Sequence, residues 1–280
     1  MKNINLLLAS ALLLASCSGT RDQNLVLNDS EYFERQGVNV LVFSNLYNGG
    51  FNDEKNSGIE IIHHGVRTVQ GGAVRLSSTP EQWDLVPATP SRTVNKEDGS
   101  IEVALRYEDY DFDSRVVVTG KGEAVEIAVY LDEPLPEKLA GHAGFNLEFL
   151  PSAYWNHSYI VDGKPNYFPR YAGYDTETKP LAEKAKQVNN LTTSDDRGTG
   201  KFVAPKPLAE GRKFVMAPDD PKRLITVTGD TDIQLYDGRI LAQNGWFVLH
   251  SFLPADKTGK VMEWMVEPNS VSTWVREPII

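Results

Sequence analysis

The chain has 280 residues, of which 41% are hydrophobic and 24% charged, and its formal net charge is −10 at pH 7. This length predicts one large domain or two small ones, and the hydrophobic share is sufficient for a sizeable core. The acidic balance argues against nucleic-acid binding, which depends on Lys and Arg contacts to phosphates, and the single cysteine excludes an internal disulfide.

The N-terminus predicts export and a lipid anchor. Lys2 is followed by an apolar run too short to span a bilayer, so residues 1–16 are interpreted as a secretory signal peptide. The segment LASC at residues 14–17 resembles a bacterial lipobox, in which Cys17 receives the lipid and becomes the first mature residue. The alternative is a plain signal peptide with a chance cysteine. The lipid would attach the exported chain to the membrane, at the outer membrane or the cell surface.

The polar residues 17–30 predict a flexible tether, which places the folded domain at 31–280. Within it, short runs rich in β-branched residues predict strands, and two of them alternate strictly between apolar and polar residues. Asp98-Gly99 and the glycines at 120 and 122 are typical hairpin residues between them. The strands expected in this half of the chain are 38–43, 58–66, 73–76, 101–107, 112–118 and 125–131.

The C-terminal part continues in the same style, with a tight hairpin turn expected at Asp237-Gly238 and only one short helix expected, at 181–188. Strands joined without intervening helices favour an all-β fold, an antiparallel β-sandwich. The stretch 155–212 is rich in Pro, Gly, Lys and Asp and predicts a long loop excursion. One sandwich with this excursion is favoured over two subdomains. The strands expected here are 223–228, 232–236, 239–242, 246–253 and 261–266.

His63 and His64 are adjacent at the end of a predicted strand. In a regular strand their side chains point to opposite faces, so they cannot converge on one metal ion. The favoured interpretation is one histidine that is buried and hydrogen-bonded and one that faces solvent. The alternative is a histidine that lines a sugar site together with a carboxylate such as Glu60 or Glu148.

Two other patterns are weaker. Asp109, Asp111 and Asp113 begin like a calcium loop, but Ser114 and Gly120 stand where that motif requires glycine and glutamate. A solvated acidic strand face is the better interpretation, and we predict no metal site and no cofactor. No spacing singles out a carboxylate pair for glycoside hydrolysis, and no nucleophile elbow or phosphate loop is present.

The densest aromatic stretch covers residues 154–174. Tyr and Trp combine a flat apolar face with a polar group, and sugar rings stack on such faces. The stretch is therefore either a glycan platform or a loop held on the sandwich by its aromatic side chains. The candidate ligand-binding residues are Trp155, Tyr167, Phe168 and Tyr171.

Several phrases resemble one family. "GVNVLVFSNLYNGGFNDEKNSGIEIIHHGVRT", "LSSTPEQWD", "AGFNLEFLPSAYW" and "WMVEPNSVSTWVREPII" are similar to the N-terminal module of secreted glycoside hydrolase family 9 proteins of Bacteroidetes, over most of residues 30–280. The resemblance implies a β-sandwich, with the galactose-mutarotase supersandwich as one form of it. It also implies a following (α/α)6-barrel endoglucanase domain and a role in β-glucan breakdown at the cell envelope. The catalytic carboxylate motifs of that domain are absent from this chain, so no catalytic residue is carried over.

Three functions are consistent with these patterns. The first is a non-catalytic module that docks the family 9 catalytic domain or binds a β-glucan or oligosaccharide. The second is a mutarotase- or epimerase-like sugar enzyme, for which His63 or His64 with Glu148 is the acid–base pair to test. The third is a stand-alone surface glycan-binding lipoprotein. The abrupt end at Ile280 predicts a fragment, a split gene or a stand-alone relative.

Overall fold

The computed structural model describes residues 24–44, 57–76, 91–170, 206–240 and 246–269. In this part of the chain, strands pair edge to edge into one continuous sheet of 16 strands, and every pairing is antiparallel. The main path runs β1-β2-β3-β4-β5-β10-β15-β14-β16-β9-β8-β7-β6, and β11, β12 and β13 branch from β14. The prediction of an all-β antiparallel sandwich is confirmed.

The elements of the first half are β1 (Val26–Leu27), β2 (Phe33–Arg35), β3 (Val38–Ser44), β4 (Ser57–His63), β5 (Val66–Arg75), β6 (Ser91–Asn95), β7 (Ser100–Tyr107), η1 (Glu108–Tyr110), β8 (Phe112–Lys121), β9 (Ala124–Leu131) and η2 (Glu137–Leu139). Those of the second half are β10 (Gly144–Phe149), α1 (Pro151–Tyr154), β11 (Ser158–Val161), β12 (Lys164–Tyr167), β13 (Ala209–Met216), β14 (Ile225–Asp237), η4 (Gly238–Ile240), β15 (Phe247–Phe252) and β16 (Gly259–Pro268). No described helix is long and apolar enough to cross a bilayer.

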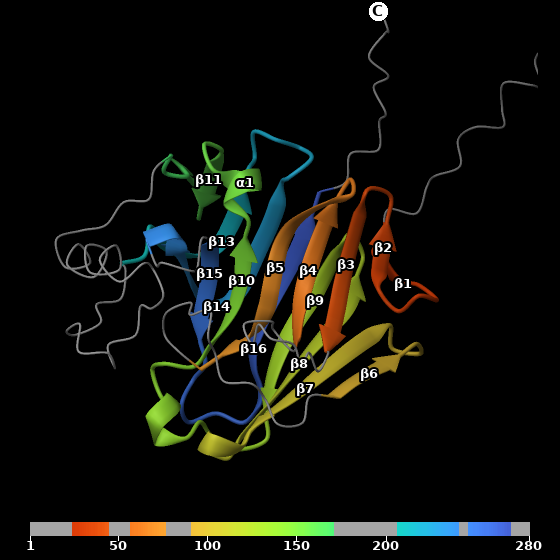
Figure 1. Cartoon of the computed structure of the whole chain (residues 1–280), viewed down its shortest axis with the longest axis vertical. Coiled ribbons are helices and arrows are strands. Elements are labelled where there is room, and N and C mark those ends of the chain that lie inside the picture. The colour runs from red at the N-terminus through yellow and green to blue at the C-terminus, as the bar shows by residue number, and fades with distance from the viewer. Residues whose placement is uncertain (1–23, 45–56, 77–90, 171–205, 241–245, 270–280) are drawn as a thin grey trace, which may run out of the picture.

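The sheet curls back on itself, which produces two layers. Figure 1 shows β3, β4, β5 and β10 in front of β7, β8, β9 and β16, and β3 contacts β7 while β5 contacts β8. The core lies between these layers. Its largest member is Trp264 of β16, which is fully buried and meets Phe145 of β10 edge to face, with ring centroids 5.2 Å apart.

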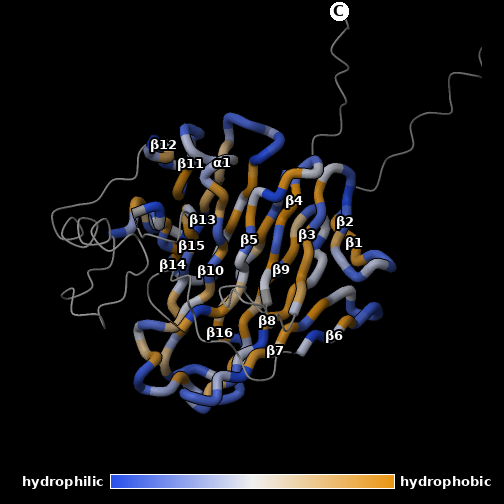
Figure 2. The backbone as a smooth tube through the Cα atoms, viewed as in Figure 1, coloured by the Kyte–Doolittle hydropathy of each residue, from blue (hydrophilic) through white to orange (hydrophobic). Residues whose placement is uncertain are grey.

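The alternating strands form because every second side chain enters this core. In β7, Ile101, Val103 and Leu105 are at most 4% exposed, while the residues between them are half-buried. Figure 2 shows the same alternation as orange and blue segments along the strands. A period of two places all apolar side chains on one face of a strand, and burying that face fixes the register.

Strand β14 belongs to both layers. Its first part, Ile225–Gly229, pairs with β16, and its last part, Gln234–Asp237, pairs with β15. The sequence predicted two strands here, at 223–228 and 232–236. They form one long strand because β13 pairs with both parts and bridges the irregular residues between them.

Three local predictions are wrong. Residues 24–30 of the predicted tether are part of the fold, because Leu25 is 3% exposed and its amide donates to the Gly122 carbonyl at 2.7 Å. Residues 239 and 240 of the predicted strand at 239–242 belong to the 3-10 turn η4. Asp237-Gly238 is not a tight hairpin turn, because the Gly238 amide donates to the carbonyl of Trp246, and β15 begins only at Phe247. Residues 241–245 lie outside the described part.

The predicted excursion at 155–212 is not a plain loop. Strands β11 and β12 form a hairpin within it, and the first residues of β13 complete its described part. These short strands lack the long apolar runs on which the sequence prediction depended. Residues 171–205, including the helix predicted at 181–188, lie outside the described part.

Candidate functional site

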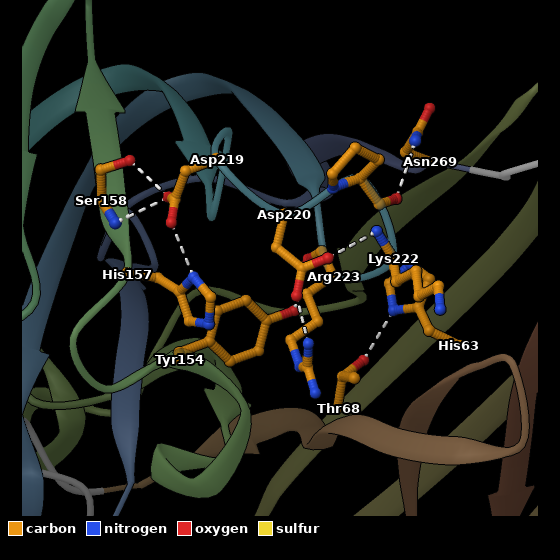
Figure 3. Close-up of polar contacts among 11 residues, drawn as sticks. His63, Thr68, Tyr154, His157, Ser158, Asp219, Asp220, Lys222, Arg223 and Asn269 are labelled. Carbon is orange, nitrogen blue, oxygen red and sulfur yellow. Dashed lines mark hydrogen bonds and ion pairs between the residues drawn. The ribbon is translucent and has the colours of Figure 1, made fainter. Parts of the chain in front are cut away.

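His63 is buried and His64 is exposed, as the favoured interpretation expected. His63 ends β4 and is 2% exposed, and its Nδ1 lies 2.8 Å from Thr68 Oγ1 (Figure 3). The Thr68 hydroxyl donates to the Ile61 carbonyl at 3.3 Å, so it accepts the proton of His63 Nδ1. Burial lowers the pKa of His63 to about 4, which keeps the ring neutral. His64 lies outside the strand, in a turn with a φ of 48°.

The predicted acid–base pair of His63 and Glu148 is not assembled. Phe149 pairs with Val69, and Val69 pairs with Ile61, so these three side chains share one face of the sheet. His63 lies two residues after Ile61 and points to that same face, whereas Glu148 precedes Phe149 and points to the other. His64 is exposed in its turn, so neither histidine shares a site with Glu148 in the described structure.

The three aspartates do not share a strand face. Asp109 lies in η1, Asp111 follows it in the left-handed region, and only Asp113 belongs to β8. Asp111 and Asp113 both accept hydrogen bonds from Arg106, on an exposed hairpin. Among the residues that the structure describes, no three His, Cys, Asp or Glu side chains are placed to hold a metal ion.

The aromatic stretch divides between core and surface. Phe168 is 2% exposed, and its ring packs against Tyr154, Tyr159 and Phe247, with centroids between 4.6 and 6.0 Å away. Phe168 is therefore a core residue and not a ligand-binding one. Tyr171 lies outside the described residues.

Among the described aromatic residues of the stretch, Trp155 and Tyr167 are the exposed ones, at 42% and 78%. The guanidinium of Arg170 lies 5.9 Å from the centre of the Trp155 ring, within the range of a cation–π contact. Figure 2 places α1, β11 and β12 together at one end of the molecule. We call Trp155, Tyr167 and Arg170 the aromatic surface.

Beside the aromatic surface, one carboxylate holds the loop before β14 onto β11. Asp219 accepts hydrogen bonds from the Ser158 amide at 2.9 Å, from the Ser158 hydroxyl, and from His157 Nδ1 at 2.8 Å (Figure 3). Although desolvation acts in the opposite direction, these hydrogen bonds hold the pKa of Asp219 well below its usual range. The serine donates to the aspartate and not to the histidine, so this is not a nucleophilic triad but a structural contact.

A second group of polar side chains lies on the sheet face that points away from the core. Cross-strand pairing aligns them in two rows across β5, β10, β15 and β14. One row contains Asn146, His250 and Gln234, and the other contains Gln70, Glu148 and Tyr236. Together with Arg75, which pairs with Gly144 in the neighbouring row, we call these side chains the polar face.

An ion pair lies at one end of the polar face. The Arg75 guanidinium donates to Glu148 at 3.0 Å, and the two side chains are 6% and 2% exposed. Gln70 also donates to Glu148, at 3.5 Å. Charged side chains are rarely buried to this extent unless they are paired, because desolvation of a lone charge costs several kcal/mol.

His250 and Asn146 form the centre of the polar face. They are directly opposite each other on β15 and β10, with His250 Nδ1 2.5 Å from Asn146 Oδ1. His250 is 1% exposed and Asn146 is fully buried. Burial lowers the pKa of His250 to about 4, so its ring is neutral at pH 7. Its Nδ1 donates to the amide oxygen, which leaves the lone pair on Nε2.

The polar face opens to solvent along β13 and β14. Tyr236 donates to Gln234, and Gln234 donates at 2.7 Å to Glu210, which is exposed. Burial, followed by the nearby Glu210 charge, raises the pKa of Tyr236. Phe252 is 36% exposed, and its ring meets His250 edge to face at 4.5 Å. The face thus passes from exposed polar groups at its rim to buried ones at its centre.

The sequence carries a signal for the polar face in the alternation of residues 144–149, which is not a motif. In GFNLEF, at 144–149, Phe145, Leu147 and Phe149 alternate with Gly144, Asn146 and Glu148. Such alternation normally marks a strand with one solvated face, but here both faces are buried. No sequence motif surrounds His250, and its partner Asn146 is 104 residues away.

Comparisons with known proteins assign no family to the chain. No family model matches it, and no curated protein matches it. Among solved structures, it is similar to the Slr1438 protein from Synechocystis sp. PCC 6803, with 10% sequence identity and a TM-score of 0.36, over 88% of this chain and 96% of that one.

Proposed function

We propose that the chain is a non-catalytic glycan-binding module of a β-glucan-degrading glycoside hydrolase family 9 system at the cell envelope. The family assignment rests on the sequence phrases that resemble the N-terminal module of those enzymes. Cys17 supplies the lipid anchor in this proposal. A β-glucan or a derived oligosaccharide is the ligand, and the family 9 catalytic domain is the partner.

The observation that supports glycan binding is the exposure of Trp155 and Tyr167 within a stretch whose other described aromatic residues are buried. Trp155 is 42% exposed and Tyr167 is 78% exposed, whereas Tyr154, Tyr159 and Phe168 are at most 3% exposed. The exposed rings are not needed for the core, so their apolar faces are available to the C–H face of a pyranose ring. The Arg170 guanidinium lies over the Trp155 ring, within the range of a cation–π contact.

Isothermal titration calorimetry with cello-oligosaccharides tests this proposal by comparing the affinities of the wild type, Trp155→Ala and Tyr167→Ala. Loss of an aromatic anchor from a binding site costs on the order of 2 kcal/mol, which corresponds to roughly a thirty-fold loss of affinity. Both variants should melt close to the wild-type temperature, because the deleted rings are exposed.

Phe168→Ala is the matched control in the same stretch. It removes a buried ring and should cost about 3–5 kcal/mol of stability. Wild-type protein that binds no cello-oligosaccharide, or two variants that bind as tightly as wild type, would contradict the glycan platform. Either result would favour the docking role, which co-purification with a family 9 catalytic domain measures directly.

A further inference from the structure

We infer that Arg239 is a positioning residue for the aromatic surface, because it fixes the backbone of Pro169 and Arg170 and thereby holds the Trp155 ring in one orientation. Arg239 belongs to η4, after the end of β14, and is 69 residues from Arg170 in the sequence. The effect on glycan affinity rests on the proposed function, whereas the orientation of Trp155 is measurable without a ligand.

The guanidinium of Arg239 is held in place by a carboxylate and an aromatic ring. Its Nε and Nη2 donate to the two oxygens of Asp237 at 2.9 and 2.8 Å, and the two side chains are 15% and 5% exposed. The guanidinium carbon also lies 4.5 Å from the centre of the Phe247 ring. A planar guanidinium that forms a two-bond pair with a carboxylate and lies over a ring has little freedom to rotate.

Other donors of the same guanidinium bind the chain segment that carries the aromatic surface. Nη2 donates to the Pro169 carbonyl at 2.6 Å, and Nη1 donates to the Arg170 carbonyl at 3.3 Å. With the two bonds to Asp237, these contacts use four of the five N–H donors that an arginine has. Residues 169 and 170 are therefore attached to the end of β14 by one side chain.

This attachment reaches Trp155 through the side chain of Arg170. The Arg170 guanidinium lies 5.9 Å from the centre of the Trp155 ring, and a cation–π contact of this kind restrains the exposed ring only while the Arg170 backbone stays in place. A side chain that is free before binding loses rotamer freedom when a ligand packs on it, which reduces affinity. A ring that is already restrained loses less, so we expect Arg239 to increase the affinity for a stacked sugar.

Tyr167 is positioned by other contacts. It belongs to β12, which pairs with β11, and the amide of the following residue, Phe168, donates to the His157 carbonyl at 2.9 Å. Loss of the Arg239 contacts should therefore reduce the contribution of Trp155 to binding and leave the contribution of Tyr167 unchanged. This contrast separates a positioning role from a general loss of structure.

The ¹H–¹⁵N heteronuclear NOE of the Trp155 indole group tests the inference without a ligand, because it reports motion of the ring on the picosecond to nanosecond timescale. Arg239→Lys should lower this NOE and leave that of the fully buried Trp264 unchanged, since an ammonium group cannot reproduce the planar fork of a guanidinium. Asp237→Asn keeps the side-chain size and one acceptor for Arg239, so it should lower the NOE to a smaller extent.

Arg92→Lys is the matched control. Arg92 also donates to two backbone carbonyls and a carboxylate, those of Val42 and Glu31, but these contacts join β6 to the N-terminal strands. Its replacement should lower the melting temperature without changing the NOE of Trp155.

Calorimetric titration with cellohexaose measures the consequence for binding. Arg239→Lys should weaken the affinity of the wild type roughly two- to ten-fold. The same substitution should add nothing in a Trp155→Ala background and should weaken binding by the same factor in a Tyr167→Ala background.

Three results would overturn the inference. They are an unchanged Trp155 NOE in a folded Arg239→Lys (or in Asp237→Asn, should the lysine variant not fold), an equal change of that NOE in Arg92→Lys, and an affinity loss that is the same with and without Trp155. Wild-type protein that binds no cellohexaose would contradict the proposed glycan binding instead, and the NOE would still decide whether Arg239 positions the ring.

Discussion

Lowering the pH from 7 to 4 should destabilise the protein through two buried histidines. His63 and His250 are at most 2% exposed, and burial lowers the pKa of each to about 4 from 6.5. In the unfolded chain both would regain the ordinary value. The unfolded state therefore binds more protons than the native state between pH 6.5 and about 4, and the free energy of unfolding must fall as the pH falls through that range.

The magnitude follows from the same pKa values. Each histidine contributes a slope of about 1.4 kcal/mol per pH unit in this window, which amounts to about 3 kcal/mol per histidine at pH 4. The carboxylate of Asp219 acts in a different range, because its pKa lies below the ordinary 3.8 and its stabilising effect is lost only under more acidic conditions. The histidine effect is thus separable from ordinary acid denaturation.

Urea denaturation at several pH values between 7 and 4 measures the slope. Replacing one histidine, as in His250→Gln or His63→Gln, should remove about half of it, and the double variant should be nearly flat above pH 4. The slope is the useful quantity, because the absolute stability of each variant also contains the cost of its altered packing. A double variant with the wild-type slope would refute the assignment to these two side chains.

Three further predictions concern the ion pair, the N-terminus and catalysis. Glu148→Leu should cost about 3–5 kcal/mol because it removes the carboxylate paired with the buried Arg75. Adding Arg75→Met should recover most of that loss in denaturant melts, and additive losses would contradict the coupling. A clickable palmitate analogue should label the wild-type chain in cells but not Cys17→Ala, and equal labelling would rule out lipidation at that residue. The purified chain from residue 18 onward should not hydrolyse carboxymethyl cellulose. Hydrolysis by the purified chain that a point substitution abolishes would contradict this prediction.

The strands were predictable where apolar and polar residues alternate along a hairpin. The segments 101–107 and 125–131 carry a clean period of two, and β7 and β9 follow them closely. The same signal failed for β11 and β12, which have four residues each, and for β13, in which buried and exposed residues do not alternate regularly. Strand β13 is positioned by pairing with β14, and β11 by pairing with β13, neither of which the sequence shows. The sequence also divided β14 at a point where β13 bridges an irregularity.

The candidate sites were harder to predict because their members come from distant strands. Arg75 and Glu148 are 73 residues apart, and His250 and Asn146 are 104 residues apart. A histidine is buried beside a polar partner only if it lies on the right face of its strand. The register of the whole sheet decides which face that is, so the sequence alone does not single out the histidine. The sequence drew attention to His63 because it is followed by a second histidine, whereas the described structure places His250 with Glu148 on the polar face.

The polar face is difficult to explain as a device for stability. Replacing a buried ion pair with apolar residues of similar size is often neutral or stabilising, so the Arg75–Glu148 pair gains the protein little on that account. His250 Nε2 and Asn146 Nδ2 have no hydrogen-bond partner among the described residues, and a buried polar atom left in that state costs free energy. An apolar row at these positions would suit the sandwich at least as well. The stability of the sandwich therefore does not explain why these costly groups are buried around the His250 ring.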